Sequence, residues 1–244
     1  MFPLSVAVPS RYLPLATWTL IAANCAVFLI QINLTPEERG WFLYRFALIP
    51  ARYFPPGGSD GRSIADYLPF LSNMFLHGGW LHLILNMWAL WLFGPIVEDR
   101  LGPARYLVFY VATGIVASLT HVVFNPASSV PALGASGAIA GVLGCFIRLF
   151  PFARTVVLIP IFLFPLFVEV PAIFFAALWF MLQVLQGTGS LLTPEQGDGV
   201  AWWAHVGGFA AGFLLTPVLR QTKPRYRRYF ADEGILGFDP QGRP

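Results

Sequence analysis

The longest uncharged run of this chain covers 42 residues, 106–147, and it limits the possible folds more than any other feature. A helix needs about 20 apolar residues to cross the hydrocarbon core of a bilayer, so the run is long enough for two spans. The sequence N-P-A-S-S-V-P at 125–131 provides a turn between them. A second uncharged run of 25 residues, 12–36, predicts another span near the start of the chain.

The composition agrees with a membrane location. Charged residues make up 11% of the chain, whereas soluble domains carry about 25%. The uncharged runs of 25 and 42 residues exclude an outer-membrane barrel, because the strands of a barrel need only about ten residues of alternating hydrophobicity each. Cys25 and Cys145 lie in apolar segments and show no metal-ligand spacing, so we expect no disulfide, no metal and no cofactor. The expected surroundings are the lipid bilayer and other membrane proteins, with no role in binding nucleic acid.

Charges, prolines and glycines divide the chain into six predicted spans. They lie within 12–36, at 77–97, twice within 106–147, from Pro171 onward, and at 199–219. Residues 155–168 are apolar but too short to cross, and two prolines interrupt them, so we expect this segment to skim the membrane. The predicted fold is all-α: a polytopic membrane protein with a bundle of six transmembrane helices.

This bundle defines the predicted domain organisation. A short cytoplasmic N-terminus (1–12) precedes the six-span domain (13–219), in which residues 35–70 form a long outer loop with aromatic side chains at the membrane interface. A basic, flexible cytoplasmic tail (220–244) follows.

The basic residues predict the orientation in the membrane. Four of the 15 Lys and Arg residues lie in the loop 35–70, and the other eleven lie in segments on the opposite side. Cytoplasmic segments carry an excess of Lys and Arg, so we expect both termini in the cytoplasm. The expected location is a bacterial plasma membrane, with any active site opening to the outer side.

Four polar residues fall near one depth in three different spans. Counted from the outer ends of their spans, His82, Ser136 and His205 each lie five or six residues, or roughly 7–9 Å, below the surface. Asn86 lies one turn deeper than His82, on the same helix face. Polar side chains are rare inside membranes and often functional, so this agreement in depth indicates a site.

These side chains suit serine protease chemistry. A serine beside an imidazole is a nucleophile with its general base, which makes Ser136 and His205 the expected catalytic pair. His82 and Asn86, with the Ser136 backbone N–H near a helix N-terminus, are the expected donors to an oxyanion. No acid lies in spans two, four or six, so we expect a dyad without a third carboxylate.

Small residues predict how spans four and six meet. Gly137 and Gly141 are four apart, and His205, Gly208 and Gly212 form one stripe, so two helices can approach closely there. We assign supporting or packing roles to His77, Gly134, Gly137, Gly141, Gly208 and Gly212.

Other interpretations use some of the same residues. Ser136 could bond to its own helix backbone in a packing face, and Asn86 could make an interhelical hydrogen bond. Haem ligation by His82 and His205 is a further alternative, although it gives Ser136 and Asn86 no role. A zinc protease would need H-E-x-x-H, and a transporter would be expected to place an acid inside the bundle; neither feature is present.

The motifs taken together resemble those of the rhomboid intramembrane serine proteases. They are FLHGGWLHLILN at 75–86, GPIVEDRLG at 94–102, GASG at 134–137, AHVGG at 204–208 with Gly212, and EVPA at 169–172 with Trp179 and Gln183. The resemblance covers roughly residues 13–219. It implies that Ser136, with His205 as base, cleaves peptide bonds in or near transmembrane segments of membrane-protein substrates. Some members carry an aromatic residue one turn after the serine, which stacks on the histidine, where this chain has Ala140.

Two functional hypotheses follow from the resemblance. The chain is an active protease, or it is a catalytically inactive rhomboid-like membrane-protein binder or chaperone. Inactive members usually lack the serine or the histidine, and both are present here, which favours the enzyme. For a protease, the depth of Ser136 predicts helix-weakening residues in the substrate, and its small neighbours predict a small side chain just before the scissile bond.

Overall fold

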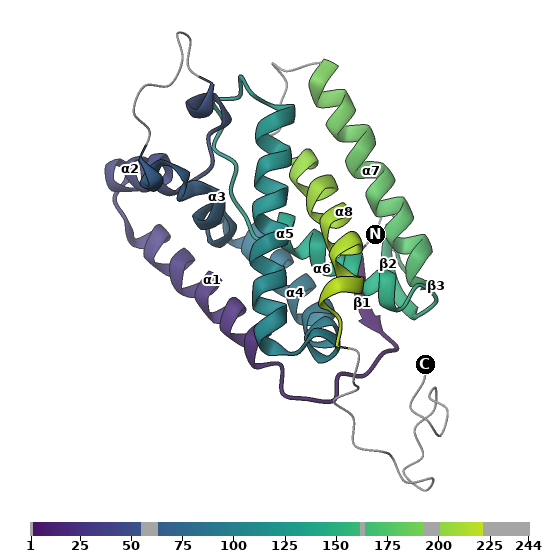
Figure 1. Cartoon of the computed structure of the whole chain (residues 1–244). Coiled ribbons are helices and arrows are strands. Elements are labelled where there is room, and N and C mark those ends of the chain that lie inside the picture. Colours follow the sequence, from purple (N-terminus) through teal and green to yellow (C-terminus); the bar gives the residue numbers. More distant parts are fainter. Residues whose placement is uncertain (1, 55–62, 162–163, 193–200, 222–244) are drawn as a thin grey trace, which may run out of the picture.

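The computed structural model describes residues 2–54, 63–161, 164–192 and 201–221 of the 244-residue chain, and most of them are helical (Figure 1). The helices are α1 (Leu15–Asn33), α2 (Pro36–Phe46), α3 (Pro69–Ser72), α4 (Trp80–Leu101), α5 (Pro103–Phe124), α6 (Ser136–Leu149), α7 (Ala172–Leu192) and α8 (Trp202–Leu219). The strands are β1 (Phe2–Val6), β2 (Arg154–Ile161) and β3 (Phe164–Pro171). Short 3-10 helices cover Pro50–Tyr53, Ile64–Tyr67 and Asn73–Phe75.

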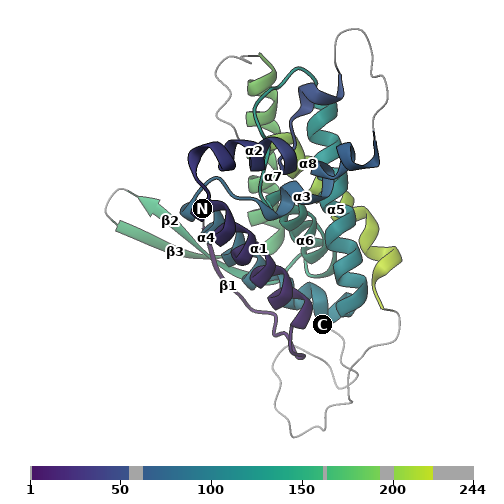
Figure 2. The same ribbon diagram turned by 90° about the vertical axis from the view of Figure 1, so that its left-hand side faces the viewer.

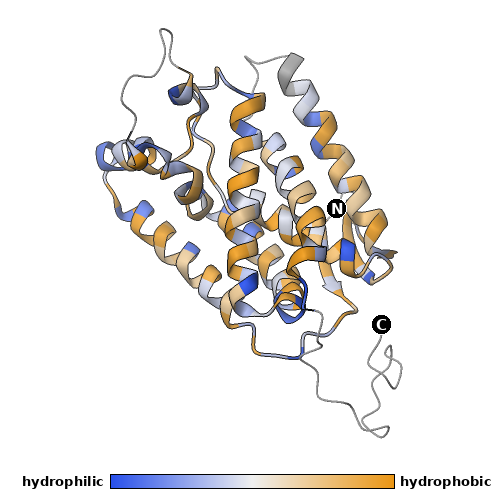
Figure 3. Ribbon diagram, viewed as in Figure 1, coloured by the Kyte–Doolittle hydropathy of each residue, from blue (hydrophilic) through white to orange (hydrophobic). Residues whose placement is uncertain are grey.

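The helical bundle confirms the predicted fold class. Within the described residues, α1, α4, α5, α7 and α8 are long and apolar enough to cross a membrane, and the 14-residue α6 is a shorter apolar helix. Residues Gly137 to Ile147 of α6 are all buried, because α4, α5 and α8 pack around it. Colouring by hydropathy shows mainly apolar helices, with polar residues gathered on α2 and at the opposite end of the bundle (Figure 3).

The segment before α6 explains why this helix starts inside the bundle. Leu48 and Ala132 exchange two backbone hydrogen bonds, of 3.0 and 2.8 Å, which hold the segment extended after α5. The Gly134 N–H then donates to the Asn73 carbonyl at 2.9 Å, and Gly134 takes a φ of +126°, a conformation that favours glycine. Ser136 is then the first residue of α6.

The outer loop (35–70) contains short helices, which the sequence analysis did not predict. Thr35 and Glu38 form a capping box that starts α2, and the backbone and hydroxyl hydrogen bonds from Thr35 lower the pKa of the Glu38 carboxyl. Trp41 and Tyr44 on α2 are 69% and 54% exposed, in keeping with the predicted interfacial position. Residues 55–62 of this loop lie outside the described part of the chain.

Residues 155–168 form most of an antiparallel hairpin, β2 and β3, which the sequence analysis did not predict. β1 adds to the hairpin in the order β1-β2-β3. The sequence R-T-V-V-L-I of β2 is rich in the β-branched residues that favour strands. In Figure 2 this hairpin projects sideways from the bundle. Residues Phe2–Val6 of the predicted N-terminal segment are therefore part of the folded structure.

Two acidic residues lie in the last turn of α4, which continues past the predicted boundary at residue 97 to Leu101. The Glu98 carboxylate accepts hydrogen bonds from the backbone N–H groups of Ala16 and Thr17, at 3.0 and 2.8 Å. Asp99 likewise accepts the N–H groups of Arg11 and Tyr12, at 2.5 and 3.2 Å. A negative charge at the first turn of α1 satisfies free N–H groups and complements the helix dipole.

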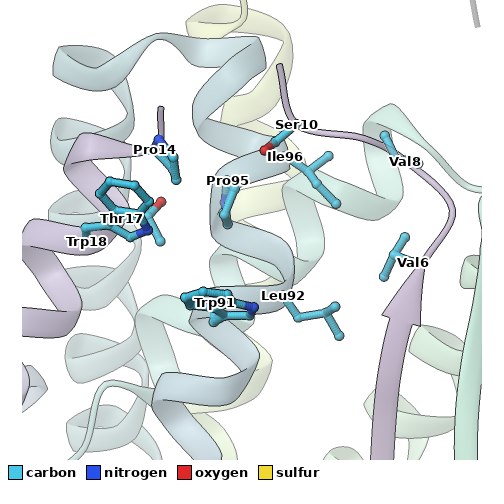
Figure 4. Close-up of a pocket in the computed structure, with 10 residues that line it drawn as sticks. All are labelled: Val6, Val8, Ser10, Pro14, Thr17, Trp18, Trp91, Leu92, Pro95 and Ile96. Carbon is cyan, nitrogen blue, oxygen red and sulfur yellow. The ribbon is translucent and has the colours of Figure 1, made fainter. Parts of the chain in front are cut away.

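A groove lies beside this junction, between α1 and α4. Its volume is about 320 Å³, and the segment that follows β1 borders it on one side (Figure 4). It is lined by Val6, Val8, Ser10, Pro14, Thr17, Trp18, Trp91, Leu92, Pro95 and Ile96.

Candidate active site

Ser136 and His205 are in direct contact. The Oγ atom of Ser136 lies 2.7 Å from Nε2 of His205. Ser136 begins α6 and His205 lies in the first turn of α8, so the contact depends on how closely these two helices approach.

Glycines permit that approach. A Cβ atom at Gly208 would collide with the backbone carbonyl of Gly137, and one at Gly212 would collide with the carbonyl of Gly141. On its other side, Gly141 packs against Thr113 of α5, where a Cβ would come within 2.6 Å of the Thr113 hydroxyl oxygen. The backbones of α6 and α8 therefore touch where two larger residues would hold them apart.

The His205 ring is held by α7. Its Nδ1 atom lies 2.7 Å from Oε1 of Gln183. Its ring packs beside that of Trp179, with centroids 5.8 Å apart and planes inclined at 37°, and the Trp202 ring meets it edge-on at 6.2 Å. Trp179 thus supplies an aromatic neighbour to the histidine, although Ala140 stands one turn after the serine.

His82 and Asn86 flank the serine from α4. The Gly78 N–H lies 3.4 Å from Nδ1 of His82, and a Cβ at Gly134 would stand only 2.7 Å from Nε2 of His82 and 3.6 Å from Nδ2 of Asn86. Nδ2 of Asn86 is buried and has no hydrogen-bond partner among the described residues. A buried amide donor without a partner is costly, and an acceptor beside it would recover that cost.

His77 lies behind this group rather than within it. It is fully buried, and its backbone carbonyl and N–H bond the Gln31 side chain of α1 at 2.7 and 3.2 Å. The His77 ring meets the His82 ring edge-on, with centroids 5.1 Å apart. His77 therefore ties the start of α4 to α1 and limits where the His82 ring can lie.

The four polar residues share one cavity of about 550 Å³ between α4 and α7. Its apolar part is lined by Leu85, Ala89, Phe93, Ile139, Ala140, Leu143, Phe175 and Trp179. Phe2 and Pro3 of β1 also line it: the Phe2 ring stacks on Trp88 at 5.7 Å, and the Trp88 indole N–H donates to the Pro3 carbonyl at 2.8 Å. A molecule bound in this cavity would meet the Ser136 hydroxyl, both imidazoles and the Asn86 amide.

Sequence reasoning missed two contributors to this site. Gln183 was part of the family resemblance but had no assigned role, and its spacing from Trp179 (i, i+4) was the one signal that the two share a helix face. The contribution of Phe2 and Pro3 had no local signal, because β1 depends on pairing with a strand about 150 residues away.

Comparison with known proteins places the chain in a family. Residues 65–222 match the model of the Rhomboid domain. The chain is 32% identical over 153 residues to Rhomboid protein 1, mitochondrial, of Saccharomyces cerevisiae, covering 61% of this chain and 39% of that protein. It is 31% identical over 231 residues to RHOMBOID-like protein 4 of Arabidopsis thaliana, covering 84% of this chain and 52% of that protein.

A bacterial relative carries the word protease in its name. The Rhomboid protease GluP of Bacillus subtilis is 40% identical over 93 residues, which are 37% of this chain and 18% of that protein. The matched regions thus span about half or less of these three relatives. The family model, by contrast, matches most of this chain, including all four polar residues of the cavity. The resemblance seen in the motifs is confirmed, and the chain belongs to the rhomboid family.

Proposed function

We propose that this rhomboid-family protein is an intramembrane serine endopeptidase in which Ser136 is the nucleophile and His205 the general base. The contact of 2.7 Å between Ser136 Oγ and His205 Nε2, inside an apolar helical bundle, is the observation that carries the proposal. A serine bonded to its own helix backbone would not need an imidazole at this distance. Both ring nitrogens of His205 face protein side-chain oxygens at 2.7 Å, which disfavours haem ligation.

The reaction begins when a substrate peptide bond leaves its helix, because a helical bond is shielded by its own hydrogen bonds and side chains. Ser136 Oγ attacks the carbonyl carbon while His205 Nε2 takes the hydroxyl proton. The carbonyl oxygen then becomes an oxyanion. His205 returns the proton to the leaving amine, and a water molecule repeats the sequence to release the acyl group from Ser136.

The donors to the oxyanion come from two helices. The Ser136 N–H is free at the N-terminus of α6, where the helix dipole favours negative charge. Among the described residues Asn86 Nδ2 has no hydrogen-bond partner, and like the His82 imidazole it lies beside Gly134. We assign the oxyanion to these three groups, because donors fixed in advance stabilise the charge as it forms.

Substrates and orientation follow from the same arrangement. We propose transmembrane proteins as substrates, with helix-weakening residues near the cut and a small side chain just before it. The cavity would open to the outer side, as the distribution of Lys and Arg favours, with the chain in a bacterial plasma membrane. A cysteine in place of the exposed Gly40 of α2 should react with an impermeant reagent from outside, whereas one in place of Gln221 should not.

The direct test uses a fluorophosphonate serine probe and a cleavable membrane substrate. The wild-type protein in detergent or liposomes should be labelled and should cleave the substrate, and Ser136→Ala and His205→Ala should each abolish both. Ser129→Ala, at an exposed serine of the segment before α6, is the matched control and should keep wild-type activity. Well-folded wild-type protein that is neither labelled nor active would favour the inactive binder instead.

A further inference from the structure

The side chain of Gln183 is the third partner of the Ser136–His205 pair. It is 5% exposed, on the face of α7 that meets α8. Its Oε1 atom lies 2.7 Å from His205 Nδ1, and its Nε2 atom donates to the backbone carbonyl of Trp179 at 3.2 Å.

These two contacts determine which way the amide points. The Trp179 carbonyl can only accept a hydrogen bond, so the NH₂ group of Gln183 must face it. Oε1 then faces His205, and because an amide oxygen can only accept, Nδ1 of a neutral His205 must carry the ring hydrogen. The other nitrogen, Nε2, is left with a free lone pair directed at Ser136 Oγ. A general base toward serine requires this tautomer.

We propose that Gln183 is a positioning residue that holds His205 in the tautomer and orientation needed to accept the Ser136 proton. This inference rests on the proposed function. Gln183 takes the place that a carboxylate holds in a Ser-His-Asp triad, but without charge. An unpaired carboxylate inside a membrane is expensive, whereas an amide with both ends bonded is tolerated.

One turn of α7 provides two supports for the same ring. The Trp179 ring packs beside the imidazole, and the Trp179 carbonyl accepts the hydrogen bond that orients Gln183, four residues later on the same side. Trp179 also lines the cavity. The position of α7 therefore governs both the shape of the cavity and the alignment of the base.

A structural role for Gln183 makes a different prediction. A polar side chain in a membrane helix often serves only to join helices, and its loss then lowers stability without a specific effect on the base. Three variants separate the two roles. Gln183→Met keeps the length of the side chain and removes the acceptor, whereas Gln183→Glu keeps an acceptor oxygen. Gln186→Met is the matched control, because it makes the same Gln-to-Met change at an exposed position of α7.

The kinetic test compares kcat and KM for one membrane substrate in liposomes. Loss of the partner that orients a metal-ligating histidine costs about 10–100-fold in metal affinity or activity. In a Ser-His-Asp triad, replacing the carboxylate by an amide lowers kcat by about 10⁴-fold. We expect Gln183→Met to lower kcat by about 10–100-fold with little change in KM. Gln183→Glu should recover most of that loss, and Gln186→Met should match the wild type. Equal impairment of the Met and Glu variants at position 183, with parallel losses of thermal stability, would overturn the proposal.

A spectroscopic test does not depend on activity. The chain has four histidines, so ¹⁵N-histidine NMR spectra are simple, and the signal of His205 can be identified by its loss in His205→Ala. The neutral His205 ring should show hydrogen on Nδ1 in the wild type and in Gln183→Glu, and a mixture of tautomers in Gln183→Met. An unchanged tautomer in Gln183→Met would refute the positioning role. If the wild type shows this tautomer but cleaves nothing, the contact stands and the proposed protease function fails.

Discussion

The contact between α6 and α8 and the gap between α4 and α7 are built in opposite ways. Between α6 and α8 the backbones touch, and a Cβ at Gly144 would collide with the Phe209 carbonyl just as one at Gly208 would collide with that of Gly137. Between α4 and α7 the helices meet through large side chains, such as Phe93 and Phe175, whose rings stack 6.5 Å apart. A cavity of about 550 Å³ remains beside them.

The two contacts meet different requirements of the proposed reaction. A proton transfer between Ser136 and His205 needs a fixed distance, and backbone contact cannot adjust by rotating side chains. A substrate chain needs space, and side chains that line a cavity can change rotamer to admit it. The expectation is that small changes between α6 and α8 disrupt the whole protein, whereas changes between α4 and α7 adjust activity or selectivity.

Gly208→Val should have the largest effect. Its Cβ would overlap the Gly137 carbonyl, so α8 must move away from α6, and we expect loss of cleavage together with a lower unfolding temperature. Even a displacement of about 1 Å costs roughly 10²-fold in rate. Gly40→Val on α2, where a Cβ would meet no atom of the described residues within 4 Å, is the matched control. Normal cleavage by Gly208→Val would show that the backbone contact is not required.

Asn86→Ala should have the next largest effect. It removes one proposed oxyanion donor from the α4 side of the cavity, and loss of such a donor costs about 10²–10³-fold in turnover. Thermal stability should change little, because Nδ2 of Asn86 has no partner to lose among the described residues. Asn33→Ala, at the exposed end of α1, controls for the substitution. A large loss of stability with unchanged turnover per folded molecule would return Asn86 to a packing role.

Spacing in the sequence predicted which four polar residues share this cavity. Counting residues from the ends of the spans placed Ser136, His205, His82 and Asn86 at one depth, because a helix rises a constant amount per residue. The bundle itself followed from uncharged runs, since a membrane leaves helices as the main way to satisfy the backbone of such segments. These features depend on local, periodic properties of the chain.

The features that spacing did not reveal depend on long-range contacts or on signals that were overlooked. The strand β1 forms because it pairs with β2, and no pattern within residues 2–6 predicts this pairing. The hairpin of β2 and β3 resembled an apolar segment broken by prolines, although its β-branched residues favoured a strand. The start of α2 was readable from the capping box T-x-x-E at 35–38. The pairing of Gln183 with His205 required knowing which face of α7 meets α8.

Phe2→Ala should have the smallest effect, confined to selectivity. The Phe2 ring stacks on Trp88 and lines the cavity that contains Ser136, so its removal enlarges the cavity without touching the contact between α6 and α8. One methylene group more or less in a hydrophobic pocket changes the discrimination between two substrates by about 10–200-fold. Removing the Phe2 ring opens the cavity on one side only, so we expect a smaller change, about a threefold gain in relative kcat/KM for substrates with a bulky side chain. The measurement is the ratio of kcat/KM for two substrates that differ only in Phe or Ala before the scissile bond.

Phe152→Ala, at a ring that is 78% exposed next to β2, is the control and should leave the ratio unchanged. If Phe2→Ala also leaves it unchanged, β1 borders the cavity without shaping the space that the substrate uses. Such a result would assign selectivity to the walls formed by α4, α6 and α7.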